Sequence, residues 1–180
     1  MFSRRPLACS TKIGDGRSEI RGSGDLVVPE TDPLLRVCSL LNKHSAKYII
    51  IGGHACILHG LVRTTEDVDL LVEGSEENLA GVIAALSEME DGAAKELTPR
   101  DLLENVIVKI ADEVEVDVSR SAWKISYEDA IHSALHADID GVGVPYVDLK
   151  TLIATKETPR EQDRADVVRL RRLLEQQKGK

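Results

Sequence analysis

Aromatic residues and cysteines are scarce in this chain of 180 residues. Phe, Trp and Tyr make up 3% of the sequence, so few side chains are able to stack on nucleobases. These candidates are Phe2, Tyr48, Trp123, Tyr127 and Tyr146. The three cysteines, Cys9, Cys38 and Cys56, lack the spacing of a metal-binding motif, and their odd number argues against a disulfide framework. We therefore expect free thiols in a reducing compartment.

Long apolar runs and an excess of positive charge are also missing. No apolar stretch approaches the roughly 20 residues of a membrane helix, and the start "MFSRRPLACS" lacks the apolar region of a secretory signal. We therefore expect a cytoplasmic protein with no membrane partner. The formal charge is −8, which argues against standing contact with nucleic acid and leaves brief contact with an RNA open.

The length is that of one domain, with a difference between the two ends of the chain. Residues 1–30 contain scattered glycines and charges without helical or alternating periodicity. This composition predicts a disordered leader, and an extended or misassigned start is the alternative. We expect residues 31–178 to form a single domain.

Apolar periodicity from Asp32 onward predicts helices that alternate with strands. The predicted helices cover residues 33–45, 54–60, 75–89, 98–105, 126–136, 148–157 and 158–178. The predicted strands cover 47–51, 67–72, a hairpin over 106–118, and 145–147 after a Gly-rich turn. Thr158, Pro159 and Glu161 predict a capping box that begins the last helix.

Two predicted strands carry acidic residues at alternate positions. Asp67 and Asp69 share one strand face, and so do Glu115 and Asp117. If the two strands are neighbours in one sheet, three or four carboxylates converge, and each close pair costs roughly 1–4 kcal/mol. A divalent cation with oxygen ligands would offset that repulsion. The alternative is the wet face of an edge strand.

Two glycines end the buried run at 47–51. Because Gly52 and Gly53 lack side chains, an anion such as a triphosphate is able to approach the backbone closely. An ordinary tight turn is the alternative for this pair taken alone. Thirteen residues separate Gly53 from Asp67, and the turn and the carboxylates together favour a phosphoryl or nucleotidyl transfer site.

These elements resemble the motif of the nucleotidyltransferase fold of the DNA polymerase beta superfamily. The matching segments are "IGG", "DVDL" and "VDV", and the resemblance covers about residues 32–175. The longer segments "GGHACILHGLVRTTEDVDLLV" and "DLKTLIATKETPREQDRADVVRL" are more similar to the AbiEii-like branch, the nucleotidyltransferases of abortive-infection toxin–antitoxin systems and their relatives. The resemblance implies an α/β (α+β) fold, in which helices flank a small mixed β-sheet and a C-terminal helical pair follows.

The resemblance also implies a role for each carboxylate. Asp67 and Asp69 would bind two Mg²⁺ ions, and Asp117 would complete the site of the metal that activates the acceptor hydroxyl. Glu115 lies on the same strand face as Asp117 and is the alternative third carboxylate.

Lys156 and Asp163 lie at the inward-facing ends of two adjacent predicted helices. One interpretation is a partly buried ion pair that fixes the angle between the helices. The resemblance supports another, in which Lys156 reaches a nucleotide phosphate and Asp163 orients it. The other candidates for nucleotide contacts are Gly52, Gly53, His54 and Arg63, with Arg160 and Asp166 in second place.

The predicted function is a Mg²⁺-dependent nucleotidyltransferase that moves a nucleoside monophosphate from an NTP to a hydroxyl. If the toxin branch applies, the acceptor is a tRNA end and a cognate antitoxin is a partner. A protein hydroxyl or a small molecule is the alternative acceptor. The rival hypothesis is a non-catalytic module that binds nucleotide or a partner protein and regulates, and the intact set of three carboxylates argues against it.

Overall fold

The computed structural model describes residues 32–178, and the predicted leader over residues 1–30 lies outside the described residues. The helices are α1 (Pro33–Lys43), α2 (Gly52–Leu58), α3 (Glu76–Leu86), the 3-10 helix η1 (Ala93–Glu96), α4 (Pro99–Glu104), α5 (Tyr127–Ile131), α6 (Leu149–Thr155) and α7 (Glu161–Lys178). The strands are β1 (Tyr48–Ile50), β2 (Val68–Val72), β3 (Ile107–Ala111), β4 (Glu115–Ser119), β5 (Ser121–Ala122), β6 (Ile125–Ser126), β7 (Leu135–Ile139) and β8 (Val142–Tyr146). Among these helices, none combines the length and apolar character that crossing a bilayer requires.

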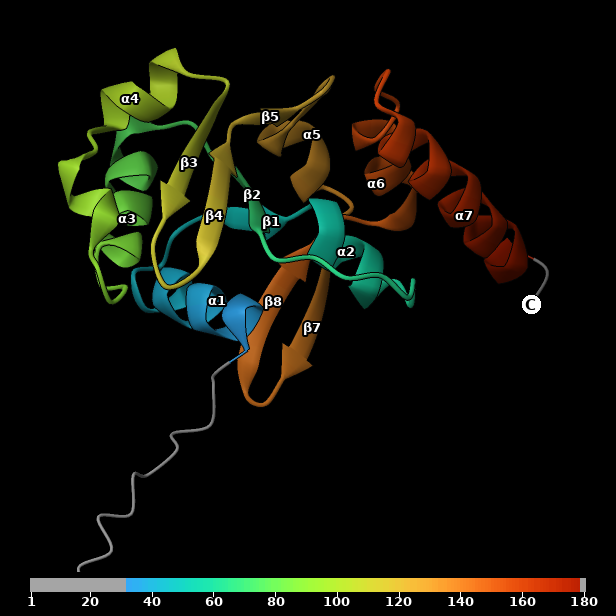
Figure 1. Cartoon of the computed structure of the whole chain (residues 1–180), viewed down its shortest axis with the longest axis horizontal. Coiled ribbons are helices and arrows are strands. Elements are labelled where there is room, and N and C mark those ends of the chain that lie inside the picture. Colours follow the sequence, from blue (N-terminus) through green and yellow to red (C-terminus); the bar gives the residue numbers. More distant parts are fainter. Residues whose placement is uncertain (1–31, 179–180) are drawn as a thin grey trace, which may run out of the picture. The chain divides into compact units, whose positions relative to one another are not determined.

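A six-stranded mixed sheet organises these elements, in the order β3-β4-β2-β1-β8-β7 (Figure 1). Strand β1 runs antiparallel to β2 and parallel to β8, while β2 runs parallel to β4. The edge strands β3 and β7 each form an antiparallel hairpin with a neighbour. Strands β5 and β6 form a separate small hairpin that follows β4 in the chain. The prediction of a small mixed sheet with flanking helices and a C-terminal helical pair is confirmed.

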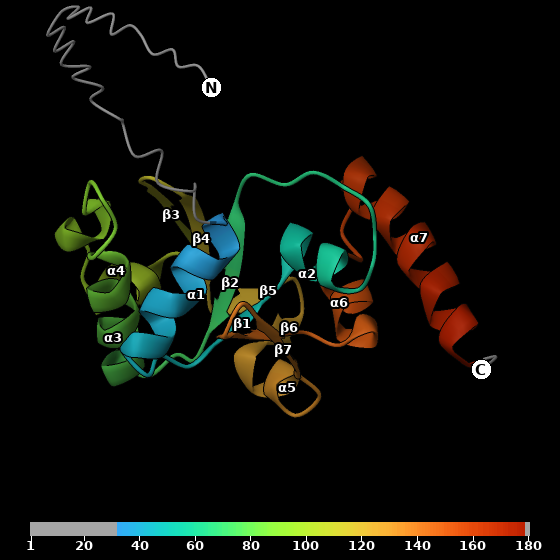
Figure 2. The same ribbon diagram turned by 90° about the horizontal axis from the view of Figure 1, so that it is seen from below.

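The core lies where the apolar stripes of α1 and α3 meet the central strands. Helix α1 begins where the Asp32 carboxylate accepts the Leu34 N–H at 2.9 Å, and its Val37 and Leu41 are fully buried. Every residue of β1 is buried. In Figure 2, α1 and α3 lie to the left of β1 and β2, and α2, α6 and α7 lie to the right. Helices α1 and α2 both pack on β2, and α1 also packs on β8, so apolar contacts stabilise the central strands.

The predicted helix over residues 126–136 is wrong in its second half. Helix α5 ends at Ile131, and residues from Leu135 form the edge strand β7. Strand β7 returns into β8 through Asp140 and Gly141, whose φ angles of 53° and 81° suit a two-residue hairpin turn. Ile131 and Leu135 have helical spacing, but both side chains are exposed, so no buried face supports a longer helix.

The last helix begins later than predicted. Helix α7 starts at Glu161, and the Thr158 hydroxyl makes contacts other than the predicted capping box. It accepts the Arg160 N–H at 3.2 Å and donates to the Asp163 carboxylate at 2.5 Å. Thr158 therefore links the end of α6 to the first turn of α7.

Candidate active site

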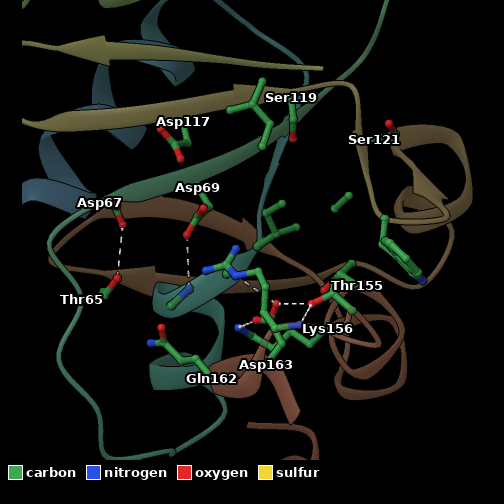
Figure 3. A pocket seen from close by; sticks show the side chains of 18 of the residues that line it. Thr65, Asp67, Asp69, Asp117, Ser119, Ser121, Thr155, Lys156, Gln162 and Asp163 are labelled. Carbon is green, nitrogen blue, oxygen red and sulfur yellow. Dashed lines mark hydrogen bonds and ion pairs between the residues drawn. The ribbon is translucent and has the colours of Figure 1, made fainter. Parts of the chain in front are cut away.

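The pairing of β2 with β4 creates an acidic surface on the sheet. The two strands are parallel, and Asp69 is the register partner of Asp117. Because neighbouring strands lie about 4.8 Å apart, these side chains project from one face at close range. Asp67 lies just before β2, and all three aspartates line one cavity of about 530 Å³ (Figure 3). The structure thus brings together the three carboxylates that the sequence singled out.

Walls of different chemistry surround these carboxylates. The diglycine turn at the start of α2 forms one wall, and Lys156 and Asp163 at the junction of α6 with α7 form another. The β5–β6 hairpin and the start of β3 contribute apolar side chains on a third side. A ligand in this cavity would therefore meet acidic, basic and apolar groups.

The diglycine turn holds Asp69 in position. The Gly53 N–H donates to Asp69 Oδ2 at 3.3 Å. Gly52 has a φ of +60°, and a Cβ atom there would overlap the Asp69 carboxylate. A Cβ atom at Gly53 would overlap the Thr65 side chain. The structure therefore gives a reason for both glycines that differs from the predicted approach of an anion, because Asp69 and Thr65 fill the space next to them.

The electrostatics of the carboxylates fit a cation. Burial raises the pKa of Asp69, the Gly53 N–H opposes this rise, and the nearby Asp117 and Asp67 add to it. Asp117 Oδ1 is buried and lies 2.9 Å from Lys109 Nζ, but it forms no hydrogen bond of good geometry within residues 32–178. A buried carboxylate oxygen in this state is costly, and a divalent cation is a suitable partner.

The carboxylates do not form a closed metal cage. Within residues 32–178, no three His, Cys, Asp or Glu side chains are placed so that they could hold a metal ion together. Asp67 and Asp117 are half-buried at the cavity surface. Binding of one ion by all three carboxylates would therefore need a different placement of their side chains.

Lys109 is a site residue that the sequence analysis missed. It is the cross-strand partner of Asp117, and its Nζ lies 2.9 Å from Asp117 Oδ1 and 3.0 Å from Glu115 Oε1. The close approach of its ammonium group to Asp117 and Glu115 raises its pKa. Its side chain is 60% exposed, so each pair contributes roughly 0–1 kcal/mol and a divalent cation is able to displace the ammonium group. The position of Lys109 within the predicted hairpin over residues 106–118 is the sequence feature that could have indicated this contact.

Of the two candidates for the third carboxylate, Asp117 lines the cavity and Glu115 does not. The Glu115 side chain is 47% exposed and forms an ion pair with Lys109. Asp117 is only 16% exposed. The geometry therefore favours Asp117.

Lys156 belongs to a buried network of two cations and two anions. Its Nζ lies 3.3 Å from Asp163 Oδ1 and 2.9 Å from Asp166 Oδ2. Asp166 Oδ2 also lies 2.7 Å from Arg63 Nη1, on the loop before β2. The side chains of Lys156, Asp163 and Asp166 are all less than 10% exposed. The predicted ion pair between the terminal helices is therefore present, and Lys156 reaches the cavity at the same time.

Other candidates for nucleotide contacts differ in position. Arg63 and Arg160 line the cavity, whereas His54 is not among the lining residues. His54 lies on α2 with Nε2 buried and without a hydrogen-bond partner in the described part of the chain. Burial lowers its pKa, so the imidazole is neutral at pH 7. Asp166 forms ion pairs with Arg63 and Lys156 and does not itself line the cavity.

Comparison with proteins of known structure identifies this fold. Neither a family model nor a curated protein matches the chain. A solved structure of a candidate nucleotidyltransferase (TM1012) from Thermotoga maritima is 14% identical, with a TM-score of 0.53 over 74% of this chain and 86% of that one. An antigenic nucleotidyltransferase-like protein from Paracoccidioides brasiliensis is 16% identical, with a TM-score of 0.51 over 76% of this chain and 72% of that one. The chain therefore has the nucleotidyltransferase fold.

Proposed function

We propose that this protein is a metal-dependent nucleotidyltransferase, which transfers a nucleoside monophosphate from an NTP to an acceptor hydroxyl. The observation that carries the proposal is the register of β2 with β4, which places Asp69 beside Asp117 in a cavity shared with Asp67 and Lys156. The nucleotidyltransferase fold supports the same reaction class.

The carboxylates are the proposed metal-binding groups. Asp67, Asp69 and Asp117 would hold two Mg²⁺ ions, which supply neutralisation of phosphate charge and activation of the acceptor hydroxyl. The chain itself fixes Asp69 through the Gly53 N–H. Lys109 lies beside Asp117, with 2.9 Å between Nζ and Oδ1.

The basic residues are the proposed phosphate-binding groups. Asp166 holds both Arg63 and Lys156 on one side of the cavity, so their positions are set before a nucleotide arrives. Positioning of this kind supplies much of the catalysis in phosphoryl transfer. When the acceptor oxygen attacks the α-phosphorus and pyrophosphate leaves, these two cations would stabilise the charge on the pyrophosphate.

The proposed branch is the AbiEii-like toxin nucleotidyltransferases, with a tRNA end as acceptor and an antitoxin as partner. The quoted resemblance of residues 52–72 and 148–170 supports this branch. Lys156 and Asp163 both line the cavity, where they would be able to take the nucleotide-binding roles that the resemblance implies. A protein hydroxyl or a small molecule is the alternative acceptor.

Lys109 supports the rival hypothesis of a non-catalytic module. Its ammonium group already neutralises Asp117 in part, so the cavity could bind a nucleotide without completing a metal site. The two hypotheses differ in whether the wild-type protein transfers label.

Transfer of label from an α-labelled NTP to tRNA, protein and small acceptors tests the proposal. Asp67→Asn and Asp69→Asn are expected to lower transfer at least about 100-fold, because each removes a metal-binding charge worth several kcal/mol. Glu77→Gln is the matched control, since it removes one exposed charge on α3 outside the cavity. Nucleotide binding without transfer by the wild-type protein would support the non-catalytic module instead.

A further inference from the structure

Exposed aromatic side chains are rare in the described part of the chain, and one of them lines the candidate active site. Tyr48 and Tyr127 are 3% and 8% exposed. Tyr146 packs edge-on against His59, with 5.3 Å between the ring centroids. Trp123 is 51% exposed and lines the carboxylate cavity. Among the Trp and Tyr residues of the chain, all of which lie within residues 32–178, Trp123 is thus the one that faces this cavity.

The backbone at Trp123 is strained without a gain in burial that would explain it. Trp123 and Lys124 form the two-residue turn between β5 and β6, and the φ of Trp123 is +58°. This region favours Gly, Asn or Asp, and a bulky residue is rare there. Since half of the indole surface is exposed to solvent, packing within the fold does not account for tryptophan at this position.

Apolar neighbours extend the indole surface. Val106 and Ile107, at the start of β3, are 76% and 53% exposed and line the same cavity. On other walls the cavity presents Arg63, Lys156 and Arg160. A ligand that carries phosphate charge at one end and a planar, partly apolar ring at the other fits this distribution, and a nucleotide is such a ligand.

We propose that Trp123 is the stacking platform for a nucleobase at the mouth of the cavity. The proposal rests on the nucleotidyltransferase function. It identifies the nucleobase as the part of the substrate that the β5–β6 hairpin binds. The ring belongs either to the NTP or to the terminal nucleotide of a nucleic-acid acceptor. Both present the same planar surface to the indole, so the test separates the two sources.

Tryptophan fluorescence provides a direct test, because Trp123 is the only tryptophan of the chain. Excitation beyond the absorption band of the nucleobases follows Trp123 alone. An NTP with Mg²⁺, or a short single-stranded oligonucleotide with a free 3′ hydroxyl, is expected to quench the fluorescence. Inorganic triphosphate, which has the phosphates and no ring, is expected to bind in calorimetry without quenching. Quenching by the NTP identifies its base as the ring, and quenching by the oligonucleotide alone identifies the acceptor.

Variants complete the test through calorimetry. Trp123→Ala is expected to weaken binding of the quenching ligand between about 5-fold and 100-fold and to leave the affinity for inorganic triphosphate unchanged. Trp123→Phe keeps an aromatic face and is expected to stay within about 3-fold of the wild type. Val168→Ala, which trims an exposed apolar side chain on α7 that does not line the cavity, is the matched control.

Two results would overturn the proposal in different ways. If the wild-type protein binds or transfers an NTP while its fluorescence stays constant with both ligands and Trp123→Ala binds normally, the stacking role is wrong and the nucleotidyltransferase proposal stands. If the wild-type protein neither binds nor transfers any NTP, both proposals are wrong. Circular dichroism of each variant identifies a variant that fails to fold. If Trp123→Ala fails to fold, the affinity of Trp123→Phe is compared with that of the wild type instead.

Discussion

Gly52 shows how one residue combines a backbone requirement with a packing requirement. Its φ of +60° is a conformation that residues with a Cβ atom rarely adopt. The space that a Cβ atom would need is filled by the Asp69 carboxylate. A substitution at Gly52 therefore disturbs the backbone and a proposed metal ligand at the same time.

We expect Gly52→Ala to lower both stability and transfer activity. The left-handed conformation of alanine costs about 1–2 kcal/mol, and the overlap with Asp69 displaces the carboxylate. Activity is expected to fall at least about 10-fold, since small displacements in an active site have large effects on rate. Urea denaturation and the labelled-NTP assay measure the two effects.

Gly81→Ala is the matched control for this substitution. Gly81 lies within α3, and a Cβ atom there meets no atom within 4 Å. Alanine is the better helix former, so this variant is expected to gain about 0.5–1 kcal/mol of stability and to keep its activity. A Gly52→Ala protein that behaves like Gly81→Ala would contradict the proposed packing of Asp69.

The sequence predicts some site residues and not others for a physical reason. Alternation along a strand is a local pattern, so spacing singled out the carboxylates that share a strand face, and the family resemblance implied their metal-binding roles. Spacing did not decide between Glu115 and Asp117. Lys109 enters the site through the register of β3 with β4. Thr65 enters through loop packing against Gly53. Such contacts between distant segments leave no local periodicity in the sequence.

At the scale of elements, a charge network fixes α7 against the rest of the fold. The Asp166 carboxylate on α7 accepts a hydrogen bond from Arg63 in the loop before β2, and it forms an ion pair with Lys156 at the end of α6. Each partner comes from a different segment. The position of α7 therefore depends on a buried interaction in addition to its apolar contacts, such as those of the fully buried Leu170.

We expect Asp166→Ala to lower the free energy of unfolding by about 3–5 kcal/mol, because it leaves two cations in a buried site with one carboxylate. Glu157→Ala is the matched control. It removes a partner of Arg171 on α7, but this pair is exposed, so a loss of no more than about 1 kcal/mol is expected. Urea denaturation of both variants gives the comparison, and similar losses would show that the buried network does not hold α7.

Helices and strands were predictable wherever the apolar pattern of the sequence matches the face that the fold buries. Strands β1 and β2 and helix α1 follow from apolar patterns that the core uses directly. Strand β7 was missed because its residues are mostly exposed and its structure comes from hydrogen bonding to β8. Edge strands of this kind depend on their partner more than on their own sequence.

At the scale of the whole molecule, the carboxylate cluster lowers the free energy of unfolding when Asp69 is ionised. Burial raises the pKa of Asp69 above the usual value of 3.8, and Asp117 and Asp67 contribute. The folded protein therefore holds this proton to a higher pH than the unfolded chain does. The cost of the ionised group is absent below pH 3.8, grows as the pH rises through the raised pKa, and is fully present above it.

We expect Asp69→Asn to stabilise the protein at neutral pH by about 0.5–2 kcal/mol while transfer activity is lost. The gain in stability over the wild type should shrink as the pH is lowered toward 4, because the wild-type carboxylate then becomes neutral as well. Thermal unfolding between pH 4 and pH 8 measures this difference. An Asp69→Asn protein less stable than the wild type at pH 7 would mean that the carboxylate is favourably solvated in the folded state.

The parallel pairing of β2 with β4 also determines when the site is able to exist. Asp67 and Asp69 are joined to Asp117 through a crossover that contains α3, η1, α4 and β3, and Asp166 follows later on α7. Since a ribosome delivers the chain from its N-terminus, a nascent chain presents the glycine turn and two carboxylates long before their partners emerge. The candidate site is therefore complete only late in biosynthesis, once α7 has left the ribosome.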